Sequence, residues 1–255
     1  MLKRSILIAA LCVVAAVFVG HDRPQGFFGV PDPIPPDNSA AQNDFEEVFT
    51  PFAFTAAQRI HESMPEFEFT LEGMHVLVTD NGEVWWDGHE IEALTITGTD
   101  GLHQVFDSLY TSNTRAEESN SYGLELEDWN FDGFLDVSLL KYPGGAGSRG
   151  AYYFWLWNPE TGRFEANTQL EELTYYSTLE AVPASGYVVS YYQLDHDSYG
   201  TSSYRYEDDG SLTEIKRVEE IWETDENDGL SVRVIVYELM FGEMVVIDDY
   251  YLAIE

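Results

Sequence analysis

The strongest indication of the fold is the segment Phe67-Glu68-Phe69-Thr70-Leu71-Glu72, in which apolar and polar residues alternate without exception. Successive side chains of a strand point to opposite faces, so this alternation predicts a half-buried β-strand. The next runs, Met74–Thr79 and Glu83–Trp86, flank Asp80-Asn81-Gly82. An Asn-Gly pair tolerates the positive φ angles of a tight turn, so these runs are expected to form a β-hairpin.

Similar runs continue along the chain, separated by turn signals rich in Asn, Asp, Gly and Pro. They are Ile91–Thr97, Gly123–Glu127, Val137–Lys141, Ala151–Trp157, Tyr187–Gln193, Ser202–Tyr206, Leu212–Glu223, Ser231–Leu239 and Met244–Tyr250. This pattern predicts a mainly β fold, an antiparallel multi-stranded meander arranged as a sandwich, a barrel or an irregular propeller-like structure. One or two short helices are expected, at Ala53–Glu62 with Thr55 as its cap and Pro65 as its stop, and at Leu102–Tyr110.

The N-terminal part of the chain has a different composition. Lys3 and Arg4 precede an apolar run from Ile6 to Val19, which is the pattern of a secretory signal peptide over residues 1–20. An uncleaved N-terminal anchor is the alternative, and it is the only membrane attachment that we expect. A Pro-rich linker is predicted over residues 21–44, followed by a single β-rich calcium-binding domain over residues 45–255. The protein is therefore expected to be periplasmic or secreted.

Charge is the unusual feature of the composition. The 255 residues include 46 Asp and Glu against 12 Lys and Arg, for a formal net charge of −34. Such a field repels phosphate backbones and anionic lipids, which argues against nucleic acid and membrane surfaces as partners. It favours divalent cations and basic proteins. Solubility in a salty or acidic medium is the other interpretation of the same charge.

The segment from Asp128 to Asp136 has the pattern D-x-N-x-D-G-x-x-D. In calcium loops of the EF-hand type, alternate residues direct oxygen atoms toward one centre and a glycine at position 6 permits the sharp turn. Position 12 is Leu139, so the bidentate glutamate of an EF-hand is missing and a dissociation constant on the order of 10⁻⁴ M is expected. An acidic turn without metal is the alternative. The predicted Ca²⁺ ligands are Asp128, Asn130, Asp132, Asp136 and the carbonyl of Phe134.

Signals for catalysis are weak. The histidines do not form an H-E-x-x-H motif, and the glycine-rich stretch Gly144–Gly150 lacks the Gly-Lys-Ser/Thr ending of a phosphate-binding loop. A glycosidase needs only two carboxylates, but this sequence cannot nominate a pair. We therefore expect a binding protein and not an enzyme. The glycine-rich loop is expected either to present Ser148, Arg149 and Tyr152 to a partner or to be an ordinary long hairpin.

Two segments together carry a resemblance to a known family. The acidic loop with its preceding Glu127 is followed, after the glycine-rich gap, by Tyr153-Phe154-Trp155-Leu156-Trp157-Asn158-Pro159-Glu160-Thr161-Gly162-Arg163-Phe164. This arrangement resembles a family of bacterial periplasmic proteins over residues 123–220. Characterised members are calcium-binding inhibitors of lysozyme-like peptidoglycan hydrolases and act as immunity proteins against antibacterial effectors of type IV secretion.

The resemblance implies a monomeric, β-rich periplasmic protein with one structural calcium ion and a loop that plugs the cleft of a hydrolase. Its partner would be a basic cell-wall hydrolase, since many lysozymes are basic and opposite charges speed association. Ser185-Gly186-Tyr187 and the segment from Ser148 to Tyr152 only approximate the Ser-Gly-x-x-Tyr loop of related inhibitors. The calcium pattern is also shared with FG-GAP repeats, so a surface or adhesion binding module without inhibitory activity is the alternative.

Overall fold

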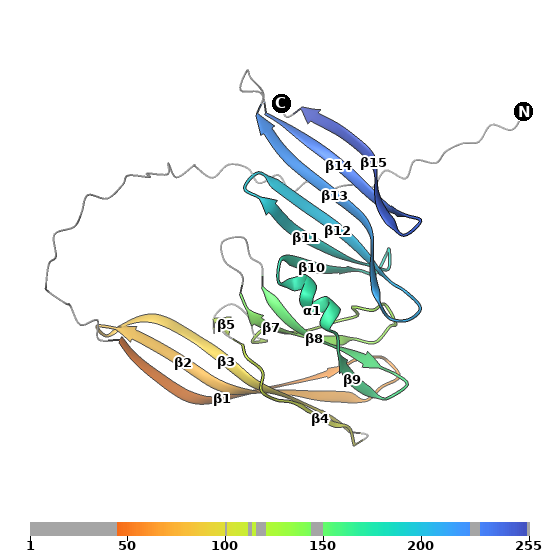
Figure 1. Cartoon of the computed structure of the whole chain (residues 1–255). Helices are drawn as coiled ribbons and strands as arrows, with labels where there is room; N and C mark the ends of the chain where they lie inside the picture. The colour runs from red at the N-terminus through yellow and green to blue at the C-terminus, as the bar shows by residue number, and fades with distance from the viewer. Residues whose placement is uncertain are drawn as a thin grey trace, which may run out of the picture. The chain divides into compact units, whose positions relative to one another are not determined.

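A computed structural model describes residues 45–99, 101–111, 114–115, 121–143, 150–224 and 230–253. The predicted signal peptide over residues 1–20 and the linker over residues 21–44 lie outside this part, as do Ser148 and Arg149. The described strands form three open antiparallel sheets with one short helix (Figure 1). The mainly β, antiparallel prediction is therefore confirmed.

Each sheet follows the chain order closely. The first contains β1 (Phe45–Arg59), β2 (Glu66–Asp80), β3 (Glu83–Gly98) and β4 (His103–Phe106), with β5 (Thr114–Arg115) also paired to β3. The second contains β6 (Leu124–Glu127), β7 (Asp136–Tyr142), β8 (Ala151–Asn158) and β9 (Arg163–Ala166). The third contains β10 (Ser177–Val182), β11 (Tyr187–Asp195), β12 (Ser198–Tyr206), β13 (Leu212–Thr224), β14 (Leu230–Met240) and β15 (Glu243–Ala253).

The sheet β6–β9 is a middle layer, because its longest strand is packed on both faces. Trp155 and Trp157 of β8 belong to a core shared with Phe67 and other residues of β2 and β3. Phe154, which points to the other face, belongs to a second core that includes Val188 of β11. A strand covered on both faces is apolar at successive positions, as β8 is.

The first hairpin confirms its prediction. Asp80 pairs with Glu83 across the turn, and Asn81 and Gly82 have φ angles of 51° and 82°. The pattern of alternation in β2 is also the pattern of burial, because Phe67, Phe69 and Leu71 are fully buried while Glu68 is exposed. The strand runs predicted from Ile91 onward are found, although Gly123 precedes β6 and Ile91–Thr97 continues the strand that begins at Glu83.

The helix predicted at Ala53–Glu62 is wrong. These residues mostly belong to β1, which pairs with β2 from Phe45 opposite Asp80 to Arg59 opposite Glu66. Phe52, Phe54 and Ala56 are partly buried while Ala53 and Thr55 are exposed, so the period is two. The long β2 template overrides the local helix propensity of the alanines. Thr55 is no cap, since its Oγ1 forms a hydrogen bond of 3.0 Å with Oγ1 of Thr70 on β2.

The helix predicted at Leu102–Tyr110 is also wrong. Its first half forms β4, which pairs with the end of β3, and the amide of Leu109 donates to the carbonyl of Glu92. The helix that does form, α1 (Thr168–Thr174), was not predicted. Asn167 is its N-cap and its side chain accepts the amide of Leu170. No helix among the described residues is both long and apolar enough to span a membrane.

Candidate functional site

The acidic loop connects β6 to β7 and closes where Glu127 pairs with Asp136. Two residues of the loop have positive φ angles, Phe131 at 62° and Gly133 at 91°. Glycine adopts this conformation without steric cost, whereas a phenylalanine in it is uncommon. The chain therefore turns back sharply twice within a few residues.

Backbone amides hold three of the predicted ligands toward the inside of this turn. Asp128 accepts the amides of Asp132 at 3.1 Å and Gly133 at 2.9 Å. Asn130 Oδ1 accepts the same Asp132 amide at 3.2 Å, and Asp132 Oδ1 accepts the amide of Phe134 at 2.9 Å. Each oxygen has a second lone pair that these hydrogen bonds do not use.

Asp136 has a different setting. It is fully buried, and its two carboxylate oxygens accept the amides of Trp129 and Trp157, each at 2.8 Å. Trp157 belongs to β8, so this side chain ties the loop to the middle sheet. The structure thus brings Asp128, Asn130 and Asp132 together through hydrogen bonds to amides of the loop. Asp136 is held separately, by the backbone amides of two tryptophans.

The loop concentrates negatively charged side chains that are partly or fully buried. Burial raises the pKa of Asp136 to about 7, although the two amide donors act in the opposite direction and the charges of Asp132 and Asp128 act with burial. Burial also raises the pKa of Asp128, with a further contribution from the charge of Asp132. None of the ion pairs formed within the described residues involves these carboxylates. A bound cation would relieve both effects.

The donors suit calcium by chemistry, since they are carboxylate and amide oxygens. Within the described part of the chain, no three His, Cys, Asp or Glu side chains are grouped so that they could hold a metal ion. A site here would therefore need the amide oxygen of Asn130, the Phe134 carbonyl or water beside the carboxylates. Asn130 Nδ2 lies 3.0 Å from Asp132 Oδ2, an arrangement that a rotation of the amide would exchange.

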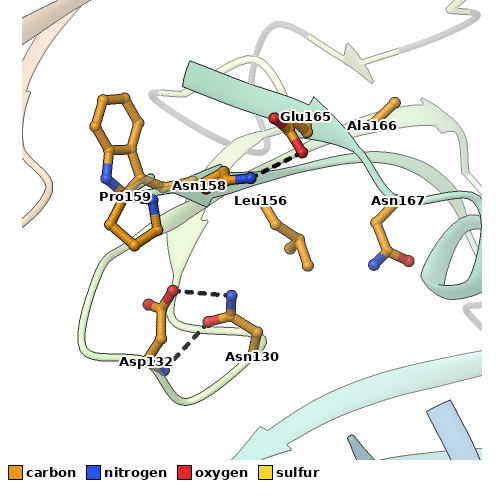
Figure 2. Close-up of a pocket in the computed structure, with 9 residues that line it drawn as sticks. Asn130, Asp132, Leu156, Asn158, Pro159, Glu165, Ala166 and Asn167 are labelled. Atoms are coloured by element: carbon orange, nitrogen blue, oxygen red, sulfur yellow. Dashed lines mark hydrogen bonds between the residues drawn. The ribbon is translucent and has the colours of Figure 1, made fainter. Parts of the chain in front are cut away.

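A pocket of about 270 Å³ opens beside the loop (Figure 2). Its lining consists of the loop residues Asn130 and Asp132, and of Leu156, Trp157, Asn158, Pro159, Glu165, Ala166 and Asn167. Most of the polar lining groups are already hydrogen-bonded within the protein. Asn158 Nδ2 donates to Glu165 Oε2 at 3.2 Å, and its Oδ1 accepts the amides of Glu160 and Thr161. The amide group of Asn158 is therefore already used in contacts within the protein.

Tyr152 is the described member of the predicted partner-binding group. It lies on β8, where its amide donates to Thr174 Oγ1 at 3.1 Å and its ring centroid is 6.2 Å from that of Phe154. Burial raises the pKa of its hydroxyl. The Tyr152 side chain is only partly exposed. Contact with a partner would therefore depend mainly on Ser148 and Arg149.

A buried cation that sequence reasoning missed lies on the neighbouring strand. Lys141 of β7 is 8% exposed; it pairs with Glu171 of α1, and its Nζ lies 4.1 Å from the ring centroid of Tyr153. Burial opposes its charge, but hydrogen bonds with Glu171 and Tyr175 hold the pKa of Lys141 above its ordinary value. In the sequence, Lys141 occupies an inward position of an apolar run, and this position could have identified it as a buried charge. The pair anchors α1 to the middle sheet.

The comparisons with known proteins are sparse. No protein-family model and no curated protein matches the sequence. One solved structure, described as "Structure of a Xanthomonas Type IV Secretion System related protein", is similar at a TM-score of 0.46 and 15% identity. The match covers 77% of this chain and 99% of that chain.

Proposed function

We propose that this protein is an exported, monomeric calcium-binding protein that inhibits a basic, lysozyme-like peptidoglycan hydrolase and has no turnover of its own. The observation that carries the proposal is the loop from Asp128 to Asp136, in which backbone amides hold Asp128, Asn130 and Asp132 inside one turn. The net charge of −34 supports a basic partner, because opposite fields speed association.

Calcium would have a structural role in this proposal. Asp128, Asn130 and Asp132 would supply side-chain oxygens, with the Phe134 carbonyl and water completing the shell. Asp136 would act mainly through the amides of Trp129 and Trp157, which hold the loop against β8. The ion would neutralise the crowded carboxylates and so fix the loop on the middle sheet.

The test is a turbidity assay of cell walls digested by a panel of basic lysozymes and bacterial peptidoglycan hydrolases. Protection by a stoichiometric amount of the protein, reduced by a chelator or by Asp132→Ala, is the expected result. The matched control is Asp107→Ala, which removes an exposed carboxylate far from the loop in sequence. Absence of protection against every hydrolase would remove inhibition.

Calcium binding is measured separately by titration calorimetry, so that the two parts of the proposal fail independently.

A surface or adhesion module that shares the calcium loop is the second candidate. It would bind calcium without protecting cell walls and would instead bind an immobilised polymer or receptor. Release of soluble sugar from a glycan substrate would contradict both binding proposals.

A further inference from the structure

The outer edge of the six-stranded sheet carries a surface that the calcium loop does not explain. The strand order β10-β11-β12-β13-β14-β15 ends at β15, which pairs with β14 on one side (Figure 1). On its other side, no strand among the described residues pairs with it. A terminal strand of this kind presents unpaired backbone donors and acceptors along its length.

β15 exposes apolar side chains beside its acidic residues, and its register with β14 shifts at Ile247, which is skipped between Val246 and Asp248. Val246 and Leu252 are each 50% exposed, and Tyr251 is 59% exposed. On the adjacent strand β14, Val232 and Val234 are only 5% and 4% exposed. Apolar side chains on a free sheet edge are typical of a surface that receives another strand.

The charges around this edge are mostly negative and unbalanced. Arg217 is paired with Glu214 and Glu219, and Arg233 is paired with Asp249. Asp248 of β15 forms no ion pair with any other described residue, and its Oδ1 accepts only the amide of Asp249. The arginines of β13 and β14 are therefore occupied, and the edge strand β15 offers the carboxylate of Asp248 to an incoming chain.

The same feature disfavours a second copy of this protein as the occupant. Asp248 is the middle residue of β15, so full antiparallel pairing of two copies would place it opposite itself. Like charges directly opposite in a sheet are destabilising, and two chains with a net charge of −34 repel each other. A strand with Lys or Arg opposite Asp248 would instead be attracted by this carboxylate and by the net negative charge of the protein.

We propose that β15 receives an extended, basic segment of a partner protein as an additional antiparallel strand. Backbone hydrogen bonds would supply affinity, while Asp248 and the exposed Val246 and Tyr251 would select alternating basic and apolar side chains. The proposal goes beyond hydrolase inhibition, because it applies to any partner that offers such a segment and requires no bound calcium.

The probe is a synthetic peptide as long as β15 with alternating Lys and Val, added to the full chain at low ionic strength. Two control peptides are the fully N-methylated version, which keeps the charge but cannot pair, and a version with Glu in place of Lys. We expect only the first peptide to bind and to protect the outward amides of β15 from hydrogen exchange. Association by charge alone would also occur with the N-methylated peptide and would leave these amides unprotected.

Matched variants locate the site on the protein. Val246→Lys on β15 should weaken peptide binding at least about tenfold, because it adds a like charge at the edge. Val105→Lys is the control, since Val105 is also 50% exposed and also lies on a terminal strand, β4 of the first sheet. Circular dichroism and melting confirm that both variants fold.

Three results would overturn the proposal. The first is equal peptide binding by both variants, and the second is the absence of protection in β15. The third is sedimentation showing that the protein alone dimerises and that Val246→Lys abolishes the dimer, which would make a second copy the occupant. All three are independent of protection of cell walls and of calcium titration, so they separate this surface from the proposed inhibition.

Discussion

β8 and β15 are both rich in apolar and aromatic residues, yet they have opposite environments. In β8, Phe154, Trp155 and Trp157 are 2%, 4% and 3% exposed, whereas the exposed fractions of Val246 and Tyr251 in β15 are 50% and 59%. The first strand lies in a middle layer with a core on each face, and the second is the last strand of its sheet. Burial therefore follows from the presence of a covering layer and not from the hydrophobicity of a strand.

This difference has energetic consequences. A buried aromatic side chain contributes through the area removed from water and through close contacts with its neighbours. An exposed side chain of the same type keeps most of its contact with water and contributes little to the free energy of unfolding. The stability of this protein should consequently be concentrated around β8, while β15 should be available for interactions. Four measurements test this difference between β8 and β15.

The largest effect is expected for Trp155→Ala in β8. Trp155 packs between Phe106, at 4.8 Å between ring centroids, and Tyr153, at 5.6 Å. Its loss removes buried area and leaves a cavity, so the free energy of unfolding should fall by about 3–5 kcal/mol. Denaturant unfolding measures this, with Tyr251→Ala in β15 as the paired control. Equal losses for the two variants would end the contrast between the strands.

The second effect concerns the pH dependence of stability in the presence of a chelator. Because the folded-state pKa of Asp136 is raised to about 7, the folded protein binds more protons than the unfolded chain between pH 4 and 7. Stability should therefore be highest at low pH in this range and fall as pH rises through 7. Between pH 5 and 8 the loss should be on the order of 3 kcal/mol, at about 1.4 kcal/mol per unit.

The Asp136→Asn variant is the control for this titration. It lacks the ionisable group, so its stability should change much less with pH over the same range, although it starts from a lower value because an amide cannot accept from both tryptophan backbones. A wild-type stability that rises between pH 5 and 8 would contradict the assignment of a raised pKa. In β15 the sign is opposite, because hydrogen bonds from Arg233 lower the pKa of Asp249.

The third effect is stabilisation by calcium. At a concentration about ten times the dissociation constant, a ligand that binds only the folded state adds about 1.4 kcal/mol. For a domain of this size the melting temperature should rise by about 3–5 °C. Thermal melts with calcium, with magnesium and with chelator measure it, and Asp132→Ala should abolish the shift. A wild-type melting temperature that is the same with calcium and chelator would leave the loop as an acidic turn.

The smallest effect on stability is expected at the free edge. Val246→Lys should change the free energy of unfolding by no more than about 0.5 kcal/mol, because the side chain is half exposed and loses little packing. The same denaturant titration measures it. A loss as large as that of Trp155→Ala would mean that β15 is covered, and the surface proposed for a partner strand would not exist.

Several features were predictable from local chemistry alone. The alternation in β2 and the Asn81-Gly82 turn specify a hairpin, because side-chain period and positive φ are properties of neighbouring residues. The acidic loop was recognisable for the same reason, since the spacing of Asp128, Asn130 and Asp132 places their oxygens inside one turn. The helix over Ala53–Glu62 failed because a partner strand, and not local propensity, determines the conformation of β1.

The amino-acid pattern thus specified many of the strands, the first hairpin turn and the composition of the acidic loop, but not β1, β4 or α1. Packing in three dimensions determined which apolar strand lies in a middle layer and which lies at an edge, because it depends on residues distant in the chain. It also decided that Asp136 binds the amide of Trp157 from β8, a contact between residues that are far apart in sequence. Local patterns specify what a segment can form, and packing between segments determines what each side chain touches.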